Sequence, residues 1–238
     1  MMPGRQPAVD DEGRLDRVER LYGRDAMTRL GSARVAVFGV GGVGGCCAES
    51  LARTGVGDLL IVDDDIVRPS NMNRQIVATT ATIGRPKAEA FAERLAVAAP
   101  DCRVEARNGR YTAETADSFD LGSFDVVIDA IDSVDDKALL IRRALAHPGV
   151  ALFSSMGAAR RTDPFQVRKS EFWKVEGDGL AKALRGRFRK SGDFPARKFV
   201  CVWSAEPPRT DGSVAHVTAV FGCALASLAV EAILAPAV

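Results

Sequence analysis

The 238-residue sequence is poor in several residue types that particular classes of protein need. Two Tyr, two Trp and two His leave little material for aromatic base-stacking platforms or histidine-built metal sites. The five cysteines are odd in number and form no CxxC pair, so no zinc ribbon is expected and the thiols should be reduced. The first twenty residues are charged and lack an apolar segment, which predicts no signal peptide and a cytoplasmic protein.

Long hydrophobic runs are also scarce. The most apolar stretch, 217–238, contains Thr218, Ser227, Glu231 and Pro236, which predicts no membrane span. We expect a buried C-terminal helix there, with a peripheral or dimer-face helix as the alternative.

The chain has no large excess of charge of either sign, since 32 Lys and Arg face 31 Asp and Glu, for a net charge of +1. This excludes a histone-like polycation, and a hydrophobic content of 47% excludes a disordered chain. The charge is uneven along the sequence, however. Residues 160–198 carry twelve Lys and Arg but five Asp and Glu, so a segment of +7 is joined to a body of −6.

Short apolar runs alternate with helix-like stretches along most of the sequence. Runs that are apolar throughout, with helices between them, indicate a parallel sheet covered on both faces. The predicted fold is therefore α/β, a Rossmann-like, mostly parallel sheet with a C-terminal strand-and-helix extension. Strands are predicted at 34–38, 58–62, 102–107, 125–129, 150–154 and 199–204, and helices at 45–53, 87–98, 137–146, 180–190 and in the C-terminal stretch.

A glycine-rich loop directly follows the first predicted strand and leads into a helix. Its glycines are Gly39, Gly41, Gly42 and Gly44, and Asp63 ends the next strand nineteen residues later. Glycines at this place let the backbone approach phosphates at a helix N-terminus, and the acid can bind ribose hydroxyls. The arrangement predicts a nucleotide site but leaves NAD, FAD and ATP open.

The next segment favours ATP over NAD. Nucleotidyl transfer builds negative charge on phosphoryl oxygens, and fixed cations or a metal ion stabilise that charge. Arg74 and Lys87 would supply the cations. A carboxylate at the end of the fourth strand, Asp129 or Asp132, would face the same crevice and hold Mg²⁺.

Together these residues resemble the adenylation core of the ubiquitin-activating-type (ThiF-type) superfamily. Within it, the sequence is most similar to the tRNA threonylcarbamoyladenosine dehydratases. The similarity runs from about residue 15 to residue 234. The stretches that carry it are 20–23, 51–57, 71–75, 127–133, 180–185 and 201–206.

The resemblance implies ATP and Mg²⁺ as cofactors and a role for each matching residue. Gly42 and its neighbouring glycines would cradle the phosphates, and Asp63 would bind the ribose. Asn73, with Arg74 and Lys87, would contact the phosphates, and Asp132 would be the Mg²⁺ ligand. Further nucleotide contacts are expected from Asp65, Ser70, Asn71 and Ser133, and catalytic roles from Arg74, Lys87, Asp132 and Arg24.

Arg24 matches the position from which these dimeric enzymes reach the ATP of a neighbouring subunit. The alternative, a surface arginine on an N-terminal helix, stays open. The resemblance also implies a homodimer and a sulfur-acceptor or cysteine desulfurase partner. It further implies one adenylation domain over 15–238 after a disordered tail at 1–14. Its parts would be a nucleotide-binding core at 33–157, a basic tRNA-facing segment at 158–198, and a closing strand and helix at 199–235.

The implied activity is the ATP-dependent dehydration, by cyclisation, of threonylcarbamoyladenosine in tRNA through a carboxyl-adenylate. The alternative enzyme is an adenylyltransferase for a ubiquitin-like sulfur-carrier protein. Those enzymes usually carry two CxxC pairs, which this sequence lacks. A non-catalytic nucleotide-binding scaffold is the second class of function.

The basic segment is where a tRNA substrate would find phosphate-neutralising side chains. Within it, Leu180 to Lys190 reads as an amphipathic helix, and Phe172, Trp173 and Phe194 would either stack on a base or pack in the core. Cys201 falls where family members can carry a cysteine. It would either form a thioester or be a buried strand residue, and the alternating pattern favours the second.

Overall fold

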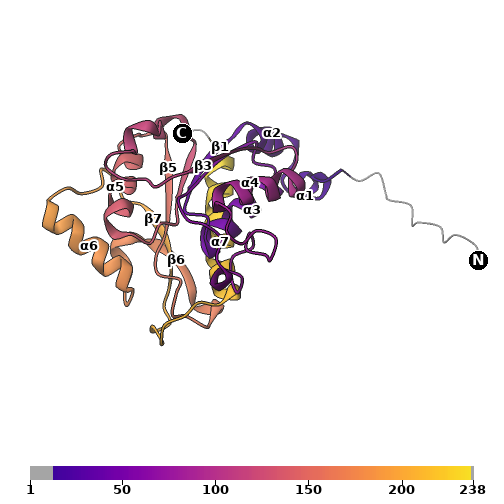
Figure 1. Ribbon diagram of the computed structural model, residues 1–238. Helices are drawn as coiled ribbons and strands as arrows, with labels where there is room; N and C mark the ends of the chain where they lie inside the picture. Colours follow the sequence, from indigo (N-terminus) through magenta and orange to yellow (C-terminus); the bar gives the residue numbers. More distant parts are fainter. Residues whose placement is uncertain (1–12, 237–238) are drawn as a thin grey trace, which may run out of the picture.

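A seven-stranded sheet runs through the middle of the protein (Figure 1). The computed structural model describes residues 13–236, so nearly all of the predicted disordered tail at 1–14 lies outside the described residues. The sheet order is β3-β2-β1-β4-β5-β7-β6, and β6 alone is antiparallel to its neighbour. The predicted α/β, mostly parallel sheet is confirmed. Its strands are β1 (Arg34–Phe38), β2 (Asp58–Asp63), β3 (Arg103–Asn108), β4 (Val126–Asp129), β5 (Ala151–Ser155), β6 (Val167–Glu171) and β7 (Val200–Ser204).

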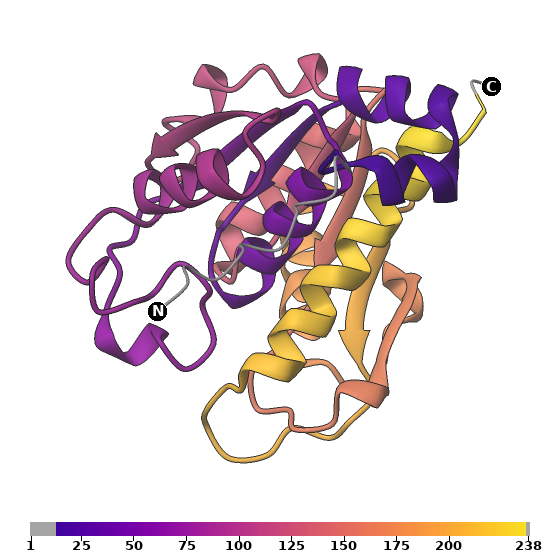
Figure 2. The ribbon, with the colours of Figure 1, turned by 90° about the vertical axis from the view of Figure 1, so that its right-hand side faces the viewer.

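Helices cover both faces of the sheet. One face carries α3 (Gly42–Thr54), α4 (Lys87–Ala98) and α7 (Ala215–Leu234), and the other carries α5 (Val134–Leu145) and α6 (Gly179–Ser191). Two short helices, α1 (Asp16–Tyr22) and α2 (Arg24–Ser32), lie beside the C-terminal end of α7 (Figure 2). Single 3₁₀ turns are η1 (Pro69–Asn71), η2 (Ala116–Ser118), η3 (Leu121–Ser123), η4 (Pro164–Gln166) and η5 (Phe172–Lys174).

The apolar runs of the sequence become strands buried on both sides. Along β1, Val35 and Val37 join the core beneath α3 and α7, whereas Ala36 and Phe38 join the core beneath α5. Successive side chains of a strand point to opposite faces, so a strand covered on both faces must be apolar at every position.

The last helix packs along the helix that follows the glycine loop, and Figure 2 shows it crossing that face of the sheet diagonally. At Gly222 a methyl group would clash with the backbone of Val43, so the two helices approach closely. By length and apolar composition alone, α7 could cross a membrane, with a mean hydropathy of 2.1. Half of its apolar stretch is buried inside the protein, in the contact with α3 and the sheet.

The strand order reverses between β1 and β4. The chain leaves β1 to build β2 and β3 on one side, then returns to build β4, β5 and β7 on the other. In open sheets of this kind, ligands bind in the crevice outside the carboxyl ends of the strands at such a reversal. The sheet topology therefore singles out the ends of β1 and β4. The predicted division into parts at 158 and 199 stays a prediction.

Candidate nucleotide-binding site

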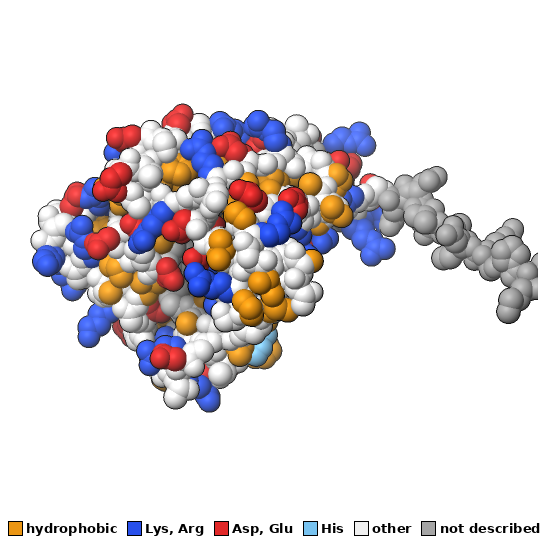
Figure 3. Space-filling model, in the orientation of Figure 1, with side chains coloured by type: hydrophobic (Ala, Val, Ile, Leu, Met, Phe, Trp, Pro, Cys, Tyr) orange, Lys and Arg blue, Asp and Glu red, His pale blue; other side chains and the backbone are white. Residues whose placement is uncertain are grey.

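A cavity of about 610 Å³ opens at the carboxyl ends of β1, β2 and β4. In the space-filling view the molecule is hollowed near its centre, where acidic and basic side chains meet (Figure 3). The structure brings most of the predicted site residues together here. Of these, Gly39, Gly41, Gly42, Gly44, Asp63, Asp65, Asn71, Arg74, Lys87, Asp132 and Ser133 line the cavity.

The glycine loop forms the floor beside β1. Gly39 has φ +86°, a left-handed conformation that favours glycine. A methyl group on Gly44 would overlap the carbonyl oxygen of Gly39, so the loop closes only with glycine at both positions. Helix α3 begins at Gly42, three residues earlier than predicted, and no side chain caps its first turn. Its free N–H groups are therefore available to an anion in the cavity.

Asp63, at the end of β2, is held facing the glycine loop. Its carboxylate accepts hydrogen bonds from the backbone N–H of Val40 at 2.8 Å and of Asp65 at 3.0 Å. Burial raises the pKa of Asp63 above its ordinary value, and Lys87 and the two N–H groups oppose that rise. A carboxylate at this place can accept hydrogen bonds from ribose hydroxyls.

Lys87 begins α4 and reaches the cavity from a nearly buried position. Its side chain is 5% exposed, and its Nζ lies 2.7 Å from a carboxylate oxygen of Asp65. The Asp65 side chain is mostly exposed, so the pair holds a cation at the cavity wall without enclosing it. This is the fixed positive charge that the sequence pattern predicts.

Arg74 is positioned by its neighbours in the chain. Its Nη1 donates to the Ser70 carbonyl at 3.0 Å and to the Asn73 side chain at 2.9 Å. Asn73 in turn donates to the Ser213 carbonyl at 2.8 Å, which ties this loop to the segment before α7. Ser70 and Asn73 thus hold Arg74 in place but are not themselves part of the cavity lining.

Of the two acids at the end of β4, Asp132 faces the cavity and Asp129 does not. Asp129 is fully buried, with Lys137 Nζ at 2.8 Å and Ser154 Oγ at 2.6 Å. Its carboxylate oxygens are therefore paired with Lys137 and Ser154 inside the core. Asp132 is exposed and lines the cavity.

The donor set around Asp132 fits Mg²⁺ of the kind that binds with a nucleotide. Among residues 13–236 no group of three or more His, Cys, Asp or Glu side chains is arranged to hold a metal ion. Mg²⁺ at nucleotide sites needs only one or two carboxylates, because phosphate oxygens and water complete its shell. Asp132 meets that requirement.

Several cavity residues were not foreseen. Gln75, next to Arg74, has a buried side-chain oxygen without a partner in the described part of the chain. Arg110 follows β3 and pairs with Asp136 at 2.6 Å. Tyr111 packs edge-on to Phe38, and burial raises its pKa to about 12. The sequence contains no motif that would assign Arg110 or Tyr111 to a nucleotide site. Both residues simply follow a half-exposed strand at the edge of the sheet.

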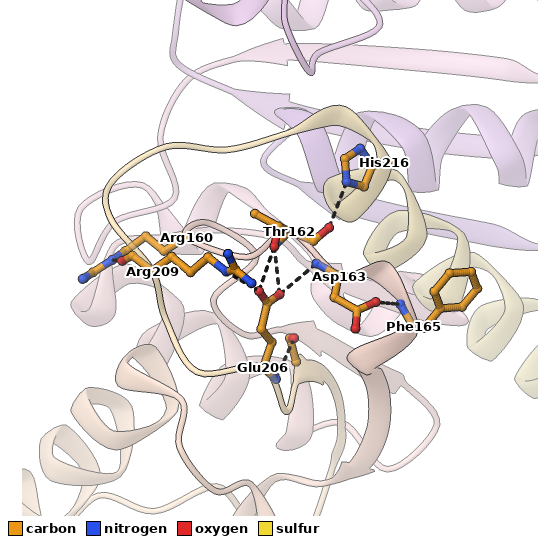
Figure 4. Close-up of polar contacts among 8 residues, drawn as sticks. Arg160, Thr162, Asp163, Phe165, Glu206, Arg209 and His216 are labelled. Carbon is orange, nitrogen blue, oxygen red and sulfur yellow. Dashed lines mark hydrogen bonds and ion pairs between the residues drawn. The ribbon is translucent and has the colours of Figure 1, made fainter.

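Two loops far apart in sequence are held together by a cluster of polar contacts around Glu206 (Figure 4). Glu206 accepts hydrogen bonds from the backbone of Thr162 at 2.8 Å and of Asp163 at 2.9 Å. It also pairs with Arg209 at 3.0 Å, and Arg160 donates to the Arg209 carbonyl at 2.9 Å. The cavity residues Ala158, Ala159 and Ser213 flank this cluster. Hydrogen bonds from backbone N–H groups hold the pKa of Glu206 down at about 2.

Arg24 does not reach this cavity. It lies at the start of α2, its side chain is 88% exposed, and it pairs with Glu19 at 3.3 Å. Within one chain it is therefore no part of the cavity lining.

The predicted basic helix forms as α6, and Figure 3 shows basic side chains at the edge of the molecule where α6 lies. Its buried residues are Ala181, Leu184 and Phe188. Phe172 is fully buried and stacks on Phe199 with ring centroids 4.8 Å apart, so it packs in the core.

Cys201 lies on β7 in the interior of the protein. It has no exposed surface, and burial raises the pKa of its thiol to about 12. It is absent from the cavity lining. These observations agree with a packing role, because a thiol of raised pKa is a poor nucleophile.

Comparison with known proteins places this chain in a family. The ThiF family model matches residues 15–237. The chain belongs to the ThiF family. One similar protein is the tRNA threonylcarbamoyladenosine dehydratase of Bacillus subtilis, 41% identical over 178 residues, which are 75% of this chain and 70% of that protein. The Escherichia coli protein of the same name is 37% identical over 84% of this chain and 77% of its own length.

A solved structure supports the family at the level of the fold. The crystal structure of the E. coli tRNA N6-threonylcarbamoyladenosine dehydratase in complex with ATP has a TM-score of 0.87 and 35% identity to this chain. The match covers 93% of this chain and 93% of that chain.

Proposed function

We propose that this protein is an adenylate-forming enzyme that uses ATP to dehydrate threonylcarbamoyladenosine in tRNA. The observation that carries the proposal is the set of similar proteins bearing this name, matched over at least 70% of their own length. The cavity adds chemical support. At the carboxyl ends of the parallel strands it combines the N-terminus of α3, the carboxylate of Asp63, which could bind a ribose, and the cations Arg74 and Lys87.

In the first step the threonyl carboxylate of the substrate attacks the α-phosphate of ATP. A bond forms between the carboxylate oxygen and phosphorus, the bond to the β-phosphate oxygen breaks, and pyrophosphate leaves. Negative charge develops on the phosphoryl oxygens and the leaving group. Lys87 and Arg74 stabilise that charge from fixed positions at the wall.

Mg²⁺, when bound with ATP, would add further charge stabilisation, and Asp132 would hold it. Asp63 binds the ribose, and the glycine loop and the first turn of α3 receive the phosphates.

In the second step the carbamoyl group of the same side chain attacks the activated carbonyl. The new bond closes a ring, the carbamoyl group gives up a proton to solvent, the bond to AMP breaks, and AMP leaves with the oxygen that the carboxylate contributed. The nucleophile and the electrophile belong to one side chain, so the step gains the effective molarity of an intramolecular reaction. The net result is the loss of one water from the nucleoside.

The RNA would lie on the basic face of α6, beside the cavity. Lys182, Arg189 and Lys190 extend from this helix into solvent, where they can neutralise phosphates. We further propose a cytoplasmic homodimer in which Arg24 of one protomer approaches the ATP of the other. Arg24 is exposed and is not part of the cavity lining of its own chain, which supports this arrangement.

The test is to incubate the protein with ATP and tRNA that carries threonylcarbamoyladenosine. We expect AMP, pyrophosphate and a nucleoside lighter by one water in mass spectrometry. Unmodified tRNA is the matched control and should give no AMP. AMP formed only with a ubiquitin-like carrier protein would contradict the proposal and favour the sulfur-carrier adenylyltransferase.

A further inference from the structure

The first turn of α6 is joined to the wall of the cavity through one buried side chain. Asp178, immediately before α6, is 2% exposed. One of its carboxylate oxygens, Oδ1, accepts the backbone N–H of Ala181 at 2.8 Å and so caps the helix. The other, Oδ2, accepts the backbone N–H of Gly157 at 3.1 Å, and Gly157 lines the cavity.

A buried cation completes this contact. The side chain of Arg161 is 3% exposed, and its nearest carboxylate is Asp178 Oδ2 at 3.9 Å. Two of its donors, Nε and Nη1, have no hydrogen-bond partner among residues 13–236. Among residues 13–236, Asp178 is the one carboxylate within 4 Å of this guanidinium, so each buried charge favours the other across that short distance.

The two ends of this contact face different parts of the site. The basic side chains of α6 face solvent, whereas Leu180 in its first turn lines the cavity with Gly157 and Met156. A methyl group on Gly157 would lie 3.2 Å from Asp178 Oδ2, so wall and helix are in close contact. A displacement of the first turn of α6 must therefore move the wall as well.

We propose that Asp178 is a positioning residue that transmits the binding of RNA on α6 to the cavity wall at Met156–Ala159. This inference rests on the proposed function. RNA phosphates bound to α6 fix the helix, and Asp178 then fixes Gly157 and its neighbours against the reacting groups. Asp178 touches neither ATP nor the substrate in this account, and it acts through the Gly157 amide and the Arg161 guanidinium.

The two oxygens of Asp178 allow a selective test. Asp178→Asn can keep Oδ1, and asparagine is a good N-cap, so α6 stays capped. The amide nitrogen that replaces Oδ2 cannot accept from Gly157, so the contact with the wall is lost. The control is Asp163→Asn, which makes the same change at the cap of η4. Among the described residues, this carboxylate accepts only from the backbone of Phe165, at 2.9 Å.

The measurement is amide hydrogen exchange with and without unmodified tRNA as the probe. In the wild type and in Asp163→Asn, tRNA should slow exchange both in 179–185 and in 156–159. In Asp178→Asn it should slow exchange in 179–185 alone. The proposal is overturned if tRNA fails to protect 156–159 in the wild type, or protects it equally in Asp178→Asn.

Turnover gives a second readout. We expect Asp178→Asn to lower kcat about tenfold or more, with Kd for ATP and for tRNA changed by about twofold at most, because misplacement affects the reacting geometry more than binding. A loss of tRNA affinity with kcat unchanged would mean that Asp178 supports only α6. If Asp178→Asn does not fold, the double variant Asp178→Asn/Arg161→Met removes the unpaired buried cation and repeats both measurements. The exchange result stands without turnover, so its failure is distinguishable from failure of the proposed reaction.

Discussion

Replacing Lys87 by methionine tests the chemical role of the cavity most directly. Methionine retains the apolar stem, which is buried, but removes the ammonium group that sits at the cavity wall. Removing one preorganised charge partner of a transition state typically lowers kcat about 10²–10³-fold, equivalent to about 2.7–4 kcal/mol. We expect this range because the Lys87 side chain is only 5% exposed, so water screens its charge little.

The assay is the ATP-dependent release of pyrophosphate with modified tRNA, together with calorimetric titration of ATP. Lys87 also lowers the pKa of Asp63, so in Lys87→Met that carboxyl should protonate at higher pH. ATP affinity should then fall at a higher pH as the solution is acidified. The control is Arg85→Met, which removes a neighbouring exposed cation paired with Glu93. A decrease in kcat of less than about tenfold in folded Lys87→Met would refute the assigned role.

Three further outcomes follow from buried and strained contacts. Lys137→Met should lower the free energy of unfolding in urea by about 3–5 kcal/mol, because it leaves Asp129 buried without its cation, and the double variant with Asp129→Asn should recover part of it. Gly44→Ala should weaken ATP binding in calorimetry by at least about tenfold through the clash with Gly39, whereas Gly186→Ala, which meets open space, should leave it unchanged. Glu206 has a pKa of about 2 against an ordinary 4.5, so its stabilisation is complete above pH 4.5 and is lost as the pH falls toward 2. Melting curves of Glu206→Gln should therefore differ from wild type at pH 7 and converge near pH 2.

Periodicity located the central elements well. The strand at 34–38 and the helix at 87–98 have the predicted bounds, because continuous apolar runs and an Ala/Glu-rich stretch have few competing structures. β6 was not predicted, because its sequence, VRKSE, is mostly polar and lacks the apolar pattern of a buried strand. It lies at the edge of the sheet. It is held by pairing with β7, a long-range contact that local pattern does not contain.

The candidate site shows the same division. Glycine spacing and the acid after β2 were sufficient to predict the floor of the cavity, because both are local to one βα unit. The polar cluster around Glu206 was not foreseen. The contacts of Glu206 with Thr162 and Asp163 join loops more than forty residues apart, and only the folded sheet brings them together. The residue pattern alone left Asp129 and Asp132 as alternatives and the resemblance favoured Asp132. The structure buries Asp129 and places Asp132 in the cavity lining.

The packing of α7 on α3 has a consequence for synthesis of the chain. The apolar face of α3, the helix that follows the glycine loop, is covered by α7. Thr218 of α7 also lines the cavity. A nascent chain that has completed β1, α3 and β2 therefore exposes an apolar face of α3 and an unfinished nucleotide cradle. Contacts between such distant segments form slowly. Since the nucleotide cavity is lined by residues of both the glycine loop and α7, ATP should bind only after α7 has docked. ATP binding should then stabilise the whole chain as one unit.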